Sequence, residues 1–277
     1  MKVDRIEHNK VDIDVISYKS IQEFYNYIIN TPINSSFRWE KLKSVENGFS
    51  FTGTNSFDEA VDLLKNGYKE GSLRLQKRLK AEETKMALVT KRKTVYGVQG
   101  YQPCVPLYLN GVPTNMITTV NKPVKQKIIV LNKDVSYNAF FTKEEIEEES
   151  IKAFRIIRKL ESQGYRCELN IVLGTSEHFI RNKKKLRAFS CRVRIKSADE
   201  RLNISKMTFA LIHPSMLRRL YFRFIEVYPD VTKQFVSGYG TPLSSDTLRE
   251  LYDGYLLPKK IDIDVDKIRS IDDLKNI

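Results

Sequence analysis

The stretch from Lys127 to Leu173 constrains the fold most, because it has the pattern of a strand, a helix and a second strand. Residues 127–131 (KIIVL) form a short apolar run, which is typical of a strand covered on both faces. From Tyr165 (YRCELNIVL) apolar and polar residues alternate, as in a strand with two unlike faces. A crossover of this length predicts that the two strands pair in parallel through a right-handed connection.

The helix between these strands is marked at both ends. Thr142 and Glu145 have the spacing of a capping box, in which each side chain accepts a hydrogen bond from the other residue's backbone N–H. Glutamates crowd the next turns, where the helix dipole stabilises negative charge. Gly164 stands where helices commonly end in the left-handed conformation. We therefore expect an α/β fold, with a mixed, mainly parallel sheet built around residues 127–173, packed helices and a helical N-terminal portion.

The chain divides into three parts by its residue patterns and by its content of glycine and proline. Residues 1–94 show strand and helix patterns and form an N-terminal α+β portion, with one predicted helix at 72–88. Residues 95–126 are punctuated by glycine and proline, which predicts a loop-rich connector packed against the core. Residues 127–277 form the α/β core with a C-terminal extension, in which 261–265 (IDIDV) has a strand pattern.

Charge is the strongest signal in the composition. The 277 residues carry a formal net charge of +13, which favours polyanions such as nucleic acid or an acidic protein surface. A lysine-rich solubilising surface would give the same total. No apolar run approaches membrane-spanning length and the N-terminus lacks the apolar core of a signal peptide, so we expect a soluble, intracellular protein without membrane contact. The three cysteines lie far apart and are expected to be reduced core thiols.

The basic residues are densest from Arg181 to Lys196, where eight of sixteen residues are basic and none is acidic. A positive loop that leads into a strand with a positive face predicts contacts with phosphate groups. An edge strand whose charges discourage strand association would look the same. A second basic run follows the helix predicted at 72–88, and a solvated helix face explains that run equally well. The candidate nucleic-acid-binding residues are Arg181, Lys183, Lys184, Lys185, Arg187, Arg192, Arg194 and Lys196, with Lys91, Arg92 and Lys93 in support.

Catalytic signatures are absent from the sequence: it contains no GxxxxGK[ST], GxGxxG, HExxH or GxSxG motif, and its three histidines are scattered. One stretch directly after the first strand, Asp134 to Asn138 (DVSYN), resembles the DxSxS metal-site motif of von Willebrand factor A-type domains. The resemblance implies that Asp134 and Ser136 are candidate ligands of a divalent cation. Asn138 replaces the second serine, and the family's later ligands have no counterpart that we can place. A loop that begins with aspartate is also common without a metal, and no other cofactor is indicated.

Four segments together resemble a family of uncharacterised tailed-phage proteins. The resemblance covers most of residues 50–225 and implies a phage or prophage origin, with the protein in the cytoplasm of an infected bacterium or in the virion. It implies no activity. The segments are 53–71 (GTNSFDEAVDLLKNGYKEG), 111–116 (GVPTNM), 160–169 (LESQGYRCEL) and 213–222 (HPSMLRRLYF).

These observations favour a non-enzymatic, basic phage protein that contacts nucleic acid in genome handling or virion assembly. The alternative is a protein-interaction module: a self-assembling virion component, and so a homo-oligomer, or a counter-defence factor that binds an acidic host protein. Metal-dependent activity around Asp134 is a third hypothesis. An exposed apolar patch would favour the second hypothesis, and a cleft that gathers carboxylates around Asp134 would favour the third.

Overall fold

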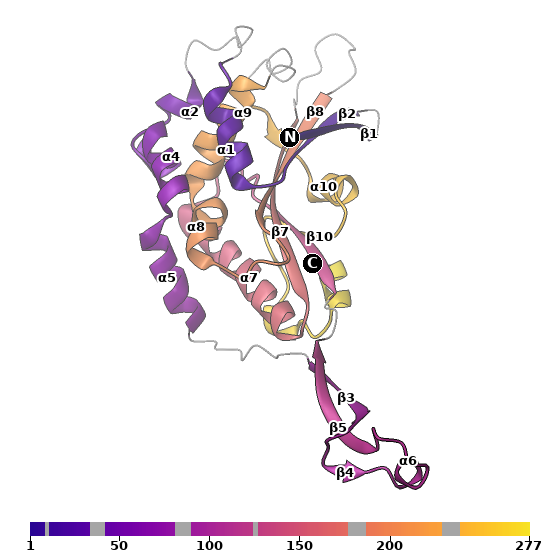
Figure 1. Cartoon of the computed structure of the whole chain (residues 1–277). Coiled ribbons are helices and arrows are strands. Elements are labelled where there is room, and N and C mark those ends of the chain that lie inside the picture. Colours follow the sequence, from indigo (N-terminus) through magenta and orange to yellow (C-terminus); the bar gives the residue numbers. More distant parts are fainter. Residues whose placement is uncertain (9–10, 34–41, 81–89, 124–126, 177–186, 229–238) are drawn as a thin grey trace.

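A mixed sheet with helices on both faces forms the body of the protein (Figure 1). The computed structural model describes residues 1–8, 11–33, 42–80, 90–123, 127–176, 187–228 and 239–277. Within them, seven strands make the main sheet, and the predicted α/β fold is confirmed. In order across the sheet, the strands are β1 (Lys2–His8), β2 (Val11–Tyr18), β8 (Arg187–Lys196), β7 (Arg166–Ser176), β6 (Ile128–Asp134) and β10 (Tyr255–Leu257), and the short β9 (Thr241–Pro242) pairs with β7.

The predicted strand–helix–strand unit is present as β6, α7 (Lys143–Ser162) and β7. β6 and β7 pair in parallel, as the crossover length required. Both bonds of the capping box form: Glu145 N donates to Thr142 Oγ1 at 3.2 Å, and Thr142 N donates to Glu145 Oε2 at 2.8 Å. Gly164 adopts a φ of +92°, which a residue with a Cβ adopts only with strain. Local signals at both helix ends therefore define this unit.

Strand directions bring several carboxyl ends to one edge of the sheet. β6 is parallel to β7 on one side and to β10 on the other. β8 is antiparallel to β7, so the start of β8 lies at this same edge, where Ala188 is opposite Ser176. β2 continues the sheet parallel to β8, and β1 closes it as an antiparallel edge strand. We call the edge formed by the ends of β6 and β7 the carboxyl edge.

The larger core lies between one face of the sheet and the helices packed on it. Phe24, Phe154, Phe209 and Phe224 are fully buried there, and each contributes about 1.5–3 kcal/mol through burial. The opposite face carries a smaller core with α10 (Ser245–Leu251). The helices of the larger layer are α1 (Ile21–Asn30), α2 (Lys43–Glu46), α3 (Phe49–Thr52), α4 (Phe57–Asn66), α5 (Lys69–Lys80), α7, α8 (Ile204–Ile212), a π-helix η1 (Met216–Tyr221) and α9 (Phe222–Val227).

Residues 90–123 form a second, three-stranded sheet that we call the arm, and Figure 1 shows it projecting from the body. Gly100 is required at the turn, because a Cβ there would lie 2.2 Å from the carbonyl oxygen of Ile117. We expected a loop-rich connector packed against the core at 95–126, but residues 95–97, 102–103 and 116–123 pair as strands, and the arm stands away from the core in Figure 1. Residues 124–126 lie outside the described chain. The arm contains β3 (Thr90–Gly97), β4 (Gln102–Pro103), α6 (Val105–Leu109) and β5 (Met116–Pro123).

The helix predicted at 72–88 is present as α5, which is described over Lys69–Lys80; residues 81–89 lie outside the described chain. The prediction of a strand at 261–265 is wrong: Ile261 N donates to the carboxylate of Glu149 rather than to a neighbouring strand. That segment leads into two 3₁₀ turns, η2 (Val265–Lys267) and η3 (Ile271–Asn276). No described helix is both long and apolar enough to span a membrane.

Candidate functional site

A cavity of about 510 Å³ opens at the carboxyl edge, and we call it the edge cavity. Its walls come from five separate parts of the chain: the α2–α3 segment, the loop after β6 (136–139), the end of β7, the η1–α9 segment and residues 239–242. Ligands of α/β proteins commonly bind at this edge of the sheet, because loops rather than helices surround the strand ends. The cavity is therefore a candidate binding site.

The segment 213–222 (HPSMLRRLYF) builds one wall and holds the others in place through its paired arginines. Arg219 is fully buried and makes five hydrogen bonds to the α2–α4 region. Its Nε donates to Thr54 Oγ1 at 2.7 Å, and its two terminal nitrogens donate to carbonyl oxygens of Ser44, Val45, Asn47 and Thr54 at 2.8–3.0 Å. A planar guanidinium with five N–H groups suits such a set of carbonyls.

Arg218 lines the edge cavity and joins two of its walls. It donates to the carbonyl oxygens of Phe51 at 2.8 Å, of Phe141 at 2.9 Å and of Asn138 at 3.3 Å, and its guanidinium lies 4.2 Å from the centre of the Phe51 ring. Burial lowers the pKa of Arg218 below its ordinary value. All of these acceptors are uncharged, and within the described residues no carboxylate forms an ion pair with Arg218.

Glu226 fixes the far side of the same wall. Its buried carboxylate accepts hydrogen bonds from Ser44 N at 3.0 Å and Tyr239 OH at 2.6 Å, and it lies 3.6 Å from Arg223 Nε. Tyr239 OH also accepts from Lys43 N at 3.1 Å. Burial, followed by the nearby Glu226 carboxylate, raises the pKa of Tyr239. A single carboxylate thus ties α9 to α2 and to the segment that begins at Tyr239.

The candidate metal ligands Asp134 and Ser136 lie beside the cavity, at the end of β6. Asp134 is fully buried, and its Oδ1 accepts from Ser136 N at 2.9 Å and from Ser136 Oγ at 2.5 Å. Its Oδ2 lies 3.6 Å from Lys259 Nζ, and burial raises the pKa of the Asp134 carboxyl. Within the described ranges, no group of three or more His, Cys, Asp or Glu side chains is placed to hold a metal ion. The charge next to Asp134 is thus supplied by a lysine.

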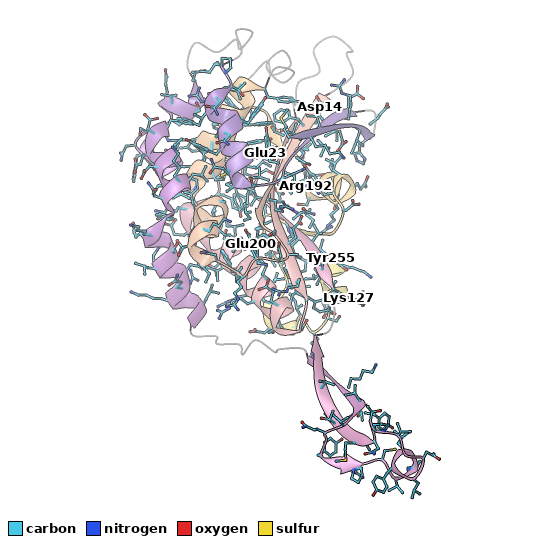
Figure 2. The ribbon with its side chains drawn as sticks, in the orientation of Figure 1. Asp14, Glu23, Lys127, Arg192, Glu200 and Tyr255 are labelled. Atoms are coloured by element: carbon cyan, nitrogen blue, oxygen red, sulfur yellow. The ribbon has the colours of Figure 1, made fainter. Side chains whose placement is uncertain are left out.

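The predicted nucleic-acid-binding residues lie in the body, in the arm and outside the described residues. Lys196 is buried, and its Nζ lies 2.8 Å from Glu161 Oε1, so its charge is neutralised inside the protein. Arg194 is half-buried and donates to the Lys19 carbonyl at 2.8 Å, while Arg192 lies in the body with its guanidinium 5.3 Å from the Tyr252 ring centre (Figure 2). Lys93 is exposed on β3 of the arm. Lys91 and Arg92 belong to β3 and Arg187 begins β8, whereas Arg181, Lys183, Lys184 and Lys185 lie outside the described residues.

Sequence reasoning did not identify the arginines and Glu226 as site residues. Arg218 and Arg219 read as charged residues projecting from an apolar helix, and nothing local shows that their partners lie more than 70 residues away at 138–141 and about 165–175 residues away at 44–54. The signal in the sequence is the LRRL core of 213–222, one of the four segments that resemble the phage family. Charged positions inside an apolar pattern indicate buried polar contacts.

A model of the family described as Domain of unknown function (DUF7192) matches residues 6–275 of the chain. The chain belongs to the DUF7192 family. All four segments that resemble the phage family lie inside the DUF7192 match, so membership of an uncharacterised domain family is confirmed. No curated protein and no solved structure matches the chain. Phage origin and the von Willebrand factor A resemblance stay predictions.

Proposed function

We propose that this DUF7192 protein is a protein-interaction module whose arm docks on another protein. The observation that carries the proposal is that no residue between 93 and 120 is buried. The arm exposes Tyr101 at 68%, Tyr108 at 65% and Leu109 at 77%, and Figure 2 shows its side chains standing apart from those of the body. A small sheet without a core has little stability of its own, and large exposed apolar side chains gathered in one element are typical of an interaction site.

The charge of the arm indicates the chemistry of its partner. Residues 94–121 contain no Asp, Glu, Lys or Arg, whereas Lys91, Arg92, Lys93 and Lys122 stand at the base. In stable interfaces the centre is apolar and the rim carries charges that complement the partner. Residues 94–121 therefore suit the apolar centre of an interface. The basic residues at the base of the arm suit a rim in which the partner carries acidic side chains. The partner that we propose is a protein surface with an apolar patch bordered by carboxylates.

The setting of this interaction follows from the phage resemblance and is part of the proposal. An acidic virion component would make the protein an assembly factor, and an acidic host protein would make it a counter-defence factor. Either partner fits the arm, because the arm would recognise only the shape and the charge of the partner's surface. Co-purification from phage-infected cells distinguishes the two by the identity of the partner.

Replacing Val105, Tyr108 and Leu109 with serine is expected to abolish capture of the partner without unfolding the body. Each of these side chains is at least 60% exposed, so the substitutions remove contact surface and leave the core intact. The measurement is affinity purification from infected cells with quantitative mass spectrometry. A control variant replaces Phe49 and Leu73, which are exposed on the body at 58% and 60%, with serine. Equal loss of the partner in both variants would contradict a role for the arm.

Nucleic-acid binding is the second function that we propose, and the position of the basic segment supports it. Residues 177–186 connect Ser176 of β7 to Arg187 of β8, so both ends of this segment are held at the carboxyl edge. The segment carries Arg181 and the three lysines 183–185 within ten residues. Phosphate contacts made by this segment would therefore lie near the carboxyl edge of the sheet.

Replacing Lys183, Lys184 and Lys185 with alanine is expected to weaken DNA or RNA binding and to make its dependence on salt shallower. Each lost phosphate contact reduces the slope of log K against log salt by about 0.7–0.9. Fluorescence anisotropy with labelled single- and double-stranded oligonucleotides at several salt concentrations measures both effects. The matched control replaces the exposed Lys69, Lys77 and Arg78 of α5 with alanine, which removes the same charge. No binding at low salt, or equal weakening in both variants, would exclude specific contacts by residues 183–185.

A further inference from the structure

We infer that the edge cavity binds a small organic anion with a planar apolar part. The inference concerns a site separate from the arm and does not depend on the proposed partner. Its first support is the charge of the walls: the charged side chains that line the cavity within the described residues are Lys43 and Arg218, and neither an Asp nor a Glu lines it there.

The buried guanidinium of Arg218 is the strongest evidence for an anion. Its side chain is 5% exposed, and its hydrogen bonds go to the uncharged carbonyl oxygens of Phe51, Asn138 and Phe141. A charge that is removed from water without a counter-charge is costly. The carboxylates behind the walls do not supply it, because Glu226 lies 3.6 Å from Arg223 and Asp134 lies 3.6 Å from Lys259. An anion in the cavity would supply the counter-charge that the described residues do not provide.

Aromatic side chains indicate the rest of the ligand. Phe51, Tyr137, Tyr221, Phe222 and Tyr239 are among the residues that line the cavity. Tyr221 OH donates to the carbonyl of Leu173 at 3.0 Å, and Tyr239 OH donates to Glu226 at 2.6 Å, so both hydroxyl groups already have partners within the protein. Flat apolar groups pack well against such rings. A volume of about 510 Å³ suits a molecule of a few hundred daltons.

Lys43 provides a test position, because it is exposed at the mouth of the cavity with its Nζ 5.3 Å from the Tyr239 ring centre. The probe is 8-anilinonaphthalene-1-sulfonate, a planar anion whose fluorescence rises on binding. Its neutral counterpart, N-phenyl-1-naphthylamine, lacks the sulfonate. We expect the wild type to bind the anionic probe more tightly than the neutral one, and Lys43→Gln to weaken only the anionic probe by about fivefold.

Two further variants keep the test decisive. Lys65→Gln removes an equivalent exposed lysine, 4.9 Å from the ring centre of Tyr25 and outside the edge cavity, and is expected to leave both probes unaffected. Ala139→Trp places a large side chain at an exposed position of the cavity wall and is expected to abolish binding of the anionic probe there. Equal affinity for both probes, or undiminished binding by Ala139→Trp, would overturn the inference.

Discussion

Replacing Arg219 with alanine is expected to lower the free energy of unfolding by about 5 kcal/mol, the largest effect of any single substitution that we predict. The fully buried guanidinium makes five hydrogen bonds, and its removal leaves the buried acceptors on Ser44 and Thr54 without a partner. Arg219→Lys keeps the charge but loses the planar fork, so it is expected to cost about 3 kcal/mol.

Urea denaturation followed by far-ultraviolet circular dichroism measures both losses. Arg201→Ala is the matched control, since Arg201 is exposed and its replacement is expected to change stability by less than about 0.5 kcal/mol. A loss below about 1 kcal/mol for Arg219→Ala would show that the α2–α4 region does not depend on this contact. The α2–α4 contacts would then have to be held mainly by Glu226 and the packed side chains.

Lowering the pH from 7 to 5 is expected to reduce the contribution of His213 to stability by about 2 kcal/mol, and by about 4 kcal/mol at pH 3. Burial, with smaller contributions from Lys143 and Arg74, lowers the pKa of His213 from 6.5 to about 3. The native protein therefore holds the neutral ring, whereas the unfolded chain takes up a proton below pH 6.5. The stability is fully present above pH 6.5 and is lost as the pH falls towards 3.

The geometry explains why the native ring stays neutral. His213 Nδ1 accepts a hydrogen bond from Ser215 N at 3.2 Å, and a proton on Nδ1 would break it. His213→Asn keeps an acceptor but does not titrate, so its stability should fall less between pH 7 and 5 than that of the wild type. The raised pKa of Asp134 acts in the opposite direction in both proteins and cancels in the comparison. Parallel urea midpoints for the two proteins over this range would rule out His213 as the cause.

The α/β unit was predictable because its signals are local. Thr142, Glu145 and Gly164 lie within 23 residues of one another and each acts on the helix that contains or adjoins it. The arm was not predicted as a sheet, since glycine and proline interrupt its pieces and β4 is two residues long. The pairing of β3 with β5 depends on their register, and a local sequence pattern does not show which residues of two strands lie opposite each other.

The edge cavity was unpredictable for a different reason. Its walls come from five segments that the fold brings together, and residues such as Phe51 and Tyr239 have ordinary sequence surroundings. The sequence indicates Asp134 as a candidate metal ligand through the DxSxS resemblance, but its pairing with Lys259 depends on the C-terminal segment. Lys196 was assigned to a positive strand face, whereas Glu161 of α7 neutralises it. The role of a charged residue depends on partners that are distant in the sequence, and the alternation of apolar and polar residues within one strand does not reveal those partners.

The contacts of Arg219 also determine when the α2–α4 region can complete its packing during translation. Thr54 leaves the ribosome 165 residues before the arginine that binds it. At about 5–20 residues per second, this corresponds to an interval of about 10–30 s. During most of that time α8 and η1, on which α5 and α4 pack in the finished protein, have not yet been made. Nascent chains from which residues 213–222 (HPSMLRRLYF) have not yet emerged should therefore be bound by ribosome-associated chaperones, and release should follow the appearance of this segment outside the ribosome.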